Sequence, residues 1–156
     1  MRRKDRAVAD PSEIREILDR ADACRIGFAV RDVPYVVAMN FGYRWTDRLT
    51  LFFHCAREGR KLRMMEENPN VCFQMDIDRK LKTGEQPCGW GMHYRSLFGT
   101  GMLSRIVSPA ERIDGLRRIL EHYGFAGKGA FDESILEATD VLKLVVDDFS
   151  AKKNTG

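Results

Sequence analysis

The sequence predicts a mainly β protein of the α+β class, in which a six-stranded antiparallel barrel is flanked by helices. Six runs rich in β-branched and aromatic residues are separated by short polar turns or by helical segments. Closing the strands into a barrel leaves no exposed edges, which favours a barrel over an open sheet. Of the 156 residues, 44% are hydrophobic and 31% are charged, so we expect one globular domain over residues 1–156.

The first elements are a helix and three strands. Asp10 is a candidate N-cap, Pro11 suits the first helical position, and Glu13 would complete a capping box. The segment before this helix is basic, and we expect residues 1–9 to form a flexible arm. Short polar turns then join three β-type runs and predict antiparallel hairpins: Cys24 to Val30, Pro34 to Phe41, and Arg48 to Cys55.

The middle of the chain predicts a short helix and two further strands. Residues Glu58 to Glu67 form the helix, which ends before Pro69 because proline restricts the residue before it. Clean alternation from Val71 to Ile77 predicts a strand with one wetter face. The aperiodic segment from Asp78 to Gly91 is long for a loop and is compatible with a lid. A long strand follows from Met92 to Val107.

The last third predicts two helices and a closing strand. Ser108 and Glu111 repeat the capping-box pattern and open the best-defined helix of the chain. A glycine-rich link leads to a weaker helix near Asp132 to Ala138. The final strand covers Val141 to Val146. Helices therefore lie between and around the strands, as the barrel prediction requires.

Composition and charge exclude several classes of protein. A net charge of +3 is too small to predict a nucleic-acid partner, and no stretch has the roughly eighteen apolar residues needed to span a bilayer. The start of the chain also lacks the apolar core of a secretory signal, so we expect a cytoplasmic protein with no membrane partner. The cysteines form no CxxC pair, which argues for reduced thiols and against a metal site: Cys24, Cys55, Cys72 and Cys88.

Cations gather where the helix over 58–67 begins. Arg57, Arg60 and Lys61 lie in or next to its first turn, although the helix dipole favours negative charge at that end. A bound anion resolves this conflict, because free backbone N–H groups and cationic side chains then converge on one phosphate. Gly59 would let the backbone approach the anion closely. The alternative is a solvent-facing basic surface, and the residues alone leave both readings open.

A second dense run of functional side chains extends from Cys88 to Gly101. Trp90 and Tyr94 offer aromatic planes that suit a flat heterocycle, and Arg95 offers fixed donors. The alternative makes the aromatics core or interface anchors and places Arg95 in an ordinary ion pair. Composition alone favours this alternative.

Five blocks occur together in this sequence: Pro34 to Tyr43, Phe53 to Ala56, Gly59 to Leu62, Asn68 to Phe73, and Tyr94 to Ser96. In order and spacing they resemble the nitroimidazole-resistance branch of the pyridoxamine 5′-phosphate oxidase-like, FMN-binding split-barrel proteins. The resemblance covers nearly the whole chain and implies a split barrel. Two departures are Ala38, where a proline is common, and Cys55, where a serine is common.

The resemblance implies three groups of cofactor-binding residues. The isoalloxazine ring would lie along Val37, Ala38, Met39 and Asn40. The ribityl phosphate would lie among His54, Cys55, Arg60 and Lys61, in agreement with the cations at the helix start. Tyr94, Arg95 and Ser96 would reach the cofactor from the partner subunit or the barrel rim, and Trp90 would cover the ring. His54 is the one candidate catalytic residue, and we favour a positioning role for it over acid–base catalysis.

The resemblance also implies an activity. We expect a homodimer with FMN at its interface, acting as an oxidoreductase on a small aromatic or nitro-aromatic acceptor of the 5-nitroimidazole kind. The electron donor is NADH, NADPH or another donor, and FAD or haem are alternatives to FMN. The rival interpretation is a protein that binds or stores flavin or haem without turnover, because a fold does not establish an activity.

Overall fold

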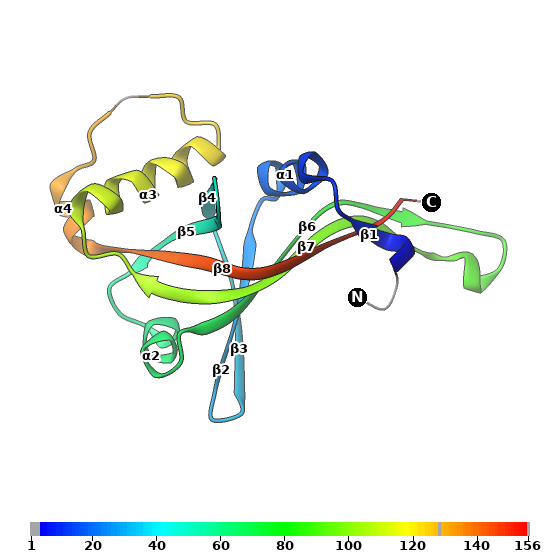
Figure 1. Ribbon diagram of the computed structural model, residues 1–156, viewed down its shortest axis with the longest axis horizontal. Coiled ribbons are helices and arrows are strands. Elements are labelled where there is room, and N and C mark those ends of the chain that lie inside the picture. The colour runs from blue at the N-terminus through cyan, green and yellow to red at the C-terminus, as the bar shows by residue number, and fades with distance from the viewer. Residues whose placement is uncertain (1–3, 128, 156) are drawn as a thin grey trace.

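The computed structural model describes residues 4–127 and 129–155 (Figure 1). The helices are α1 (Pro11–Arg20), α2 (Arg60–Glu67), α3 (Pro109–His122) and α4 (Glu133–Ala138), with short 3-10 helices η1 (Lys4–Arg6) and η2 (Pro87–Gly89). The strands are β1 (Ala7–Val8), β2 (Cys24–Val30), β3 (Val33–Met39), β4 (Phe41–Trp45), β5 (Leu49–Ala56), β6 (Asn70–Lys82), β7 (Gly91–Arg105) and β8 (Thr139–Asn154).

All the strands belong to one antiparallel sheet. Its order is β3-β2-β6-β7-β8-β5-β4, and β1 pairs with β8 beside this path. The two ends of the order, β3 and β4, are consecutive in the chain and are joined by Asn40 alone, so the sheet curls until its ends meet. The mainly β prediction with flanking helices is confirmed, but the sheet has eight strands rather than six.

Two strands of the sheet, β1 and β4, are not predicted by the sequence pattern. The predicted run from Pro34 to Phe41 breaks at Asn40, and a separate strand continues from Phe41 to Trp45. Lys4–Arg6 and Ala7–Val8 form η1 and β1 where a flexible arm is predicted, and Val8 is buried. The basic residues Arg2 and Arg3 lie outside the described residues.

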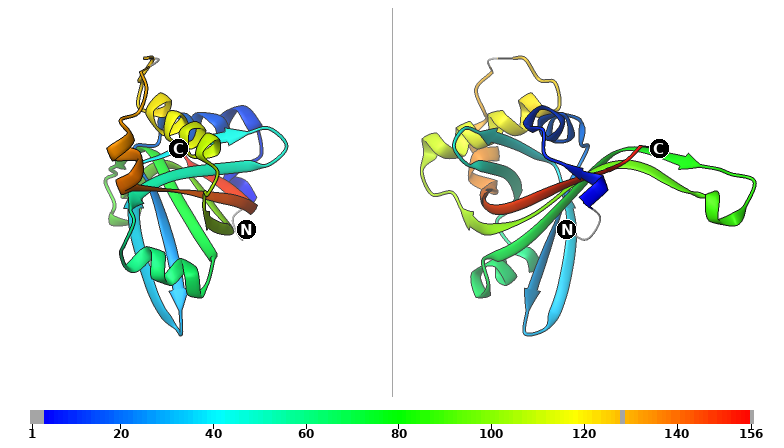
Figure 2. Two further views of the ribbon diagram at one scale, coloured as in Figure 1. Left: turned by 90° about the vertical axis from the view of Figure 1, so that its left-hand side faces the viewer. Right: turned by 45° about the vertical axis from the view of Figure 1, so that its right-hand side comes forward.

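The predicted long loop over 78–91 is also corrected. β6 continues to Lys82 and β7 starts at Gly91, so most of this segment is a β-hairpin (the arm, residues 77–94) that projects from the body (Figures 1 and 2). The register shifts between Ile77 and Lys80, where Asp78 adopts a positive φ of 56°. Such a bulge bends the strand and redirects the hairpin.

The starts of α1 and α3 are placed as predicted, but their capping boxes are incomplete. Asp10 accepts a hydrogen bond from the Ser12 backbone N–H, and Ser108 accepts one from the Glu111 N–H. The glutamates that would close the boxes instead pair with lysines of β8, Glu13 with Lys153 and Glu111 with Lys143. These two ion pairs fasten α1 and α3 to the long C-terminal strand.

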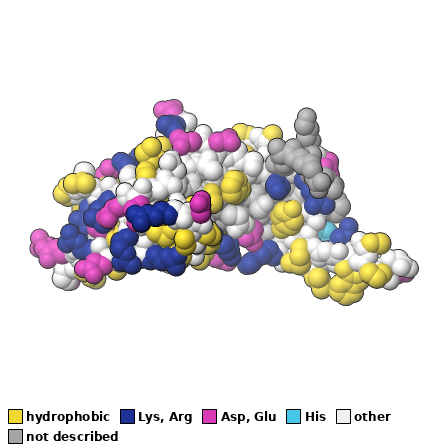
Figure 3. All heavy atoms as spheres, turned by 90° about the horizontal axis from the view of Figure 1, so that it is seen from below, with side chains coloured by type: hydrophobic (Ala, Val, Ile, Leu, Met, Phe, Trp, Pro, Cys, Tyr) yellow, Lys and Arg dark blue, Asp and Glu magenta, His cyan; other side chains and the backbone are white. Residues whose placement is uncertain are grey.

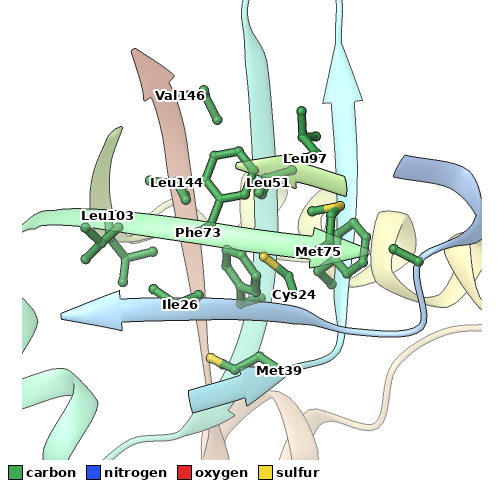
Figure 4. Packing of buried hydrophobic residues seen from close by; sticks show 14 of the residues in the cluster. Cys24, Ile26, Met39, Leu51, Phe73, Met75, Leu97, Leu103, Leu144 and Val146 are labelled. Carbon is green, nitrogen blue, oxygen red and sulfur yellow. The ribbon is translucent and has the colours of Figure 1, made fainter. Parts of the chain in front are cut away.

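The core fills the curled sheet. Side chains from four strands meet there, among them Ile26, Leu51, Phe73 and Leu144 (Figure 4). Each of these is exposed by 1% or less, which is typical of a close-packed interior. Within the described ranges, no helix has both the length and the apolar character needed to cross a bilayer.

Candidate functional site

A pocket of about 510 Å³ opens where the two ends of the sheet meet. Strands β3 and β5, the start of α2 and the α4–β8 junction form its walls. Seven of the predicted ring and phosphate residues line it: Val37, Ala38, Met39, Asn40, His54, Cys55 and Lys61. Three further lining residues were not predicted: Ala56, Ala138 and Thr139. The two predicted groups therefore share one cavity.

Strand register explains why these residues meet. Phe41 pairs with Phe53 across β4 and β5. Asn40 and His54 are the residues just beyond this pair, so they lie next to each other. Ala56 pairs with Thr139 across β5 and β8, which brings the start of β8 to the same end of the sheet. Because β3 lies at the end of the strand order, one edge of its backbone has no strand neighbour. Its free N–H and C=O groups suit the polar edge of a heterocycle.

The start of α2 provides the anion-binding end of the pocket. Its N-cap is Gly59, which makes no side-chain cap, and its first turn contains no acidic residue. Gly59 has a φ of 142°, and an added Cβ would meet nothing within 4 Å, so the backbone is open to a ligand. Lys61 lines the pocket and forms no ion pair within the described part of the chain. Uncapped amides and an unpaired ammonium favour a bound anion.

The other two cations lie beside the pocket. The helix begins at Arg60, later than predicted, and Arg57 precedes it. Arg57 donates from Nη1 to the Glu137 carbonyl at 3.1 Å, next to α4. The Arg60 guanidinium lies 4.5 Å from the ring centroid of Tyr35, so it is not in the pocket wall as the phosphate prediction expects. Of the three predicted cations, only Lys61 lines the pocket.

Two neighbouring β5 side chains differ in exposure. His54 is exposed, whereas Cys55 is buried with 8% exposure. Burial raises the pKa of the Cys55 thiol above its usual value of 9.0, and the charge of Lys61 opposes this rise only in part. The thiol therefore remains protonated at neutral pH and can donate a weak hydrogen bond where a serine is common.

The remaining predicted residues lie on the arm or at its base. Tyr94 and Ser96 line a separate pocket of about 270 Å³. Trp90 donates from Nε1 to the Gly84 carbonyl at 2.8 Å, near the tip of the arm. None of these three residues lines the first pocket. A shared site would therefore require a second subunit.

Arg95 belongs to an internal ion-pair network. Its side chain is 12% exposed, with Nη2 at 2.7 Å from Glu16 and Nε at 2.6 Å from Asp78. Arg20 joins the same two carboxylates from α1. The prediction that Arg95 contacts the cofactor is not supported by this geometry, because its donors are used within the chain. The alternative reading as an ion pair is confirmed.

Comparison with known proteins identifies the family. The family described as pyridoxamine 5′-phosphate oxidase matches residues 10–153. This chain belongs to that family. No match was found among curated proteins.

Solved structures of other proteins share this architecture. A Bacteroides thetaiotaomicron protein, provisionally named a 5-nitroimidazole antibiotic resistance protein, is 32% identical over 94% of this chain and 86% of its own, with a TM-score of 0.80. The flavocytochrome Anf3 of Azotobacter vinelandii is 21% identical over 100% of this chain and 72% of its own, with a TM-score of 0.83. An FAD and heme binding protein of Mycobacterium smegmatis is 18% identical over 97% of this chain and 74% of its own, with a TM-score of 0.82. The last two show the shared fold alone.

The two residues expected to depart from the family pattern, Ala38 and Cys55, both line the pocket. Three other lining residues, Ala56, Ala138 and Thr139, carry no chemical signal in the sequence. The pairing of Ala56 with Thr139 across β5 and β8 brings Thr139, and Ala138 directly before it, to the site.

Proposed function

We propose that this protein binds FMN in the 510 Å³ pocket, with the phosphate at Lys61 and the start of α2. One observation carries the proposal: among the residues that the structure describes, the pocket joins a helix start without a side-chain cap and a lysine without an ion pair to the free edge of β3. A phosphate ester carries a charge of about −1.5 to −2 at pH 7, which Lys61 and the helix amides would offset. The residues present therefore fit the group, and flavin would supply the redox chemistry.

The side chains of the pocket then bind and orient. The isoalloxazine ring would lie along Val37 to Asn40 and hydrogen-bond mainly to backbone groups. Asn40 and His54 are both exposed and next to each other. They would hold the flavin ring and the substrate beside it in position without transferring a proton. The neutral Cys55 thiol would face the ribityl phosphate region.

We propose that the activity is the reduction of a small aromatic or nitro-aromatic acceptor, with NADH or NADPH as the electron donor. The family and the likeness to the Bacteroides thetaiotaomicron protein support the choice of acceptor. Four free cysteines, none in a disulfide, support a cytoplasmic setting in which thiols stay reduced.

We further propose that two copies form a dimer that completes each site. The outer sheet face exposes Val36, Phe98 and Met102, and a groove of about 520 Å³ runs across it. Hydrophobic side chains also gather over the arm, which exposes Leu81, Trp90 and Met92 (Figure 3). Exposed apolar patches of this kind mark interaction surfaces. A partner seated there would bring Tyr94 and Ser96 towards a neighbouring flavin.

The absorbance spectrum of the purified protein tests the cofactor. We expect a yellow protein that releases flavin on heating, or a colourless one that turns yellow with added FMN. A protein that cannot be reconstituted with FMN would contradict the proposal, and a Soret band would indicate haem instead.

Anaerobic titration separates an enzyme from a flavin store. We expect NADH or NADPH to bleach the flavin band and a 5-nitroimidazole to restore it. If chemically reduced protein is not reoxidised by the nitroimidazole, storage is the better account.

A further inference from the structure

The hydroxyl of Tyr123 joins the two strands at the base of the β2–β3 hairpin. The β2–β3 ladder ends at the pair of Cys24 with Met39. In the same register, Asp22 would lie opposite Phe41. Instead, the Tyr123 hydroxyl accepts a hydrogen bond from the Phe41 backbone N–H at 3.3 Å and donates one to the Asp22 carbonyl at 2.8 Å. The side chain thus takes the place of a direct hydrogen bond between the two strands.

The end of α3 fixes Tyr123 in this position. His122 directly precedes it, with Nε2 at 2.9 Å from the Ala21 carbonyl and a ring centroid 4.3 Å from that of Phe41. The backbone contact of Gly42 holds β4 against the same helix. Partial burial raises the pKa of Tyr123 above its usual value of 10.0, so the hydroxyl keeps the proton that it donates. The C-terminal end of α3 therefore contacts both strands at the hairpin base.

The hairpin base lies next to the residues proposed to bind the flavin ring. Met39 and Asn40 line the pocket and directly precede Phe41. β3 lies at the end of the strand order, and β2 pairs with β6 over residues 25–27. Figure 1 shows the hairpin running from its base near α1 to a tip at the bottom of the view. Because this ladder is short, the contacts at the base determine where β3 and its pocket residues lie.

We infer that Tyr123 is a positioning residue for the flavin ring. By bonding to both Asp22 and Phe41, its hydroxyl keeps these two residues from pairing directly. Without the hydroxyl, the Phe41 N–H is free to bond the Asp22 carbonyl, which would draw Asn40 towards β2 and away from the pocket wall. This inference rests on the proposed flavin site and adds to it a residue that does not line the pocket.

Flavin binding by Tyr123→Phe tests the inference, because phenylalanine keeps the ring and removes only the hydroxyl. We expect riboflavin and FMN to lose affinity by the same factor, roughly threefold to tenfold, since the ring site changes and the phosphate site does not. At saturating FMN, the visible circular dichroism of the bound flavin should also change, which a loss of stability alone would not cause.

Tyr43→Phe is the matched control. The Tyr43 hydroxyl donates to Asp19 at 2.5 Å, between β4 and α1, and does not contact the hairpin base. This variant should bind riboflavin and FMN as the unmodified protein does, and the circular dichroism of its bound FMN should not change.

Amide hydrogen exchange in the flavin-free protein measures the effect on the hairpin base directly. We expect the Phe41 amide, which donates to the Tyr123 hydroxyl, to exchange roughly tenfold faster in Tyr123→Phe, because local opening exposes an amide that has lost its acceptor. Amides of β7 should exchange at the same rate in both proteins.

Three results would overturn the positioning role. They are unchanged flavin affinity in Tyr123→Phe, a loss of affinity for FMN but not for riboflavin, and equal losses in Tyr123→Phe and Tyr43→Phe. Each of these results leaves flavin binding by the unmodified protein intact. An unmodified protein that binds neither riboflavin nor FMN would instead refute the proposed function itself.

Discussion

Lys61 is the residue on which the phosphate assignment depends. It lines the pocket at the uncapped start of α2 and forms no ion pair in the described chain. We expect Lys61→Gln to weaken FMN binding roughly tenfold to a hundredfold, because a charge-assisted contact contributes about 1.5–3 kcal/mol. Riboflavin lacks the phosphate, so its affinity should not change. Isothermal titration of both ligands makes the comparison, and equal losses would place Lys61 elsewhere in the site.

Gly42 is a residue whose lack of a side chain determines helix packing. A Cβ built there would lie 2.3 Å from the Arg118 backbone, so β4 and α3 are in backbone contact. We expect Gly42→Ala to lower the free energy of unfolding by about 1–3 kcal/mol, because α3 must move away. Urea denaturation measures the loss. Gly91→Ala is the matched control, since nothing lies within 4 Å of its added Cβ; equal losses in both variants would contradict the packing argument.

At the residue scale, the sequence predicts the pocket better than it predicts the cations around it. Val37 to Asn40, His54 and Cys55 meet as expected because they lie on two strands whose ends converge. The partner of Arg95 in its ion pair is not predicted, because Glu16 is 79 residues away and no local pattern reveals such a pair. Arg60 lies outside the pocket wall for a similar reason, since its aromatic partner Tyr35 belongs to another element.

Among the elements, the arm was the hardest to predict. The alternation that identifies β6 ends at Ile77, and the next residues are exposed and mainly polar. A strand with solvent on both faces has no reason to alternate, so periodicity cannot reveal it. The long β8 is underestimated for a related reason, because its buried residues are concentrated in its first half and Ala151 is the one buried residue after Val146.

The ion-pair network at the base of the arm predicts a dependence on pH. Hydrogen bonds from Arg95, and then from Arg20, lower the pKa of Glu16 from 4.5 to about 2. A lowered pKa in the folded state stabilises the protein above the unfolded pKa, and this contribution is lost as pH falls from about 4.5 to about 2. We expect Arg95→Gln to be less stable than the unmodified protein at pH 7, with a difference that shrinks below pH 4.5.

Urea unfolding at pH 7, 4.5 and 3 measures that difference. Arg44→Gln removes an exposed arginine that pairs with Asp114 away from the arm, and it serves as the control. A difference between Arg95→Gln and the unmodified protein that stays constant across the three pH values would show that Arg95 stabilises by packing alone.

For the whole molecule, the sequence predicts the fold class but not how the sheet curls until its ends meet. Turns and β-type runs indicate antiparallel hairpins, whereas the order β3-β2-β6-β7-β8-β5-β4 depends on contacts distant in sequence. The break at Asn40 is decisive, because it sends β3 and β4 to opposite ends of the sheet and creates the pocket between them. A single polar residue inside a β-type run does not predict that the run divides into two strands.

The proposed dimer can be tested on the outer sheet face, away from the pocket. Phe98 is 46% exposed on β7, in the alternating row that includes Tyr94 and Ser96. We expect Phe98→Glu to yield a folded monomer in analytical ultracentrifugation, because a charge cannot be buried unpaired at an interface. Its FMN affinity should fall at least tenfold, although no pocket residue is changed. Val107→Glu, at a position 85% exposed outside the strands, should remain dimeric and bind FMN normally. A Phe98→Glu monomer with full FMN affinity would show that one chain holds the cofactor alone.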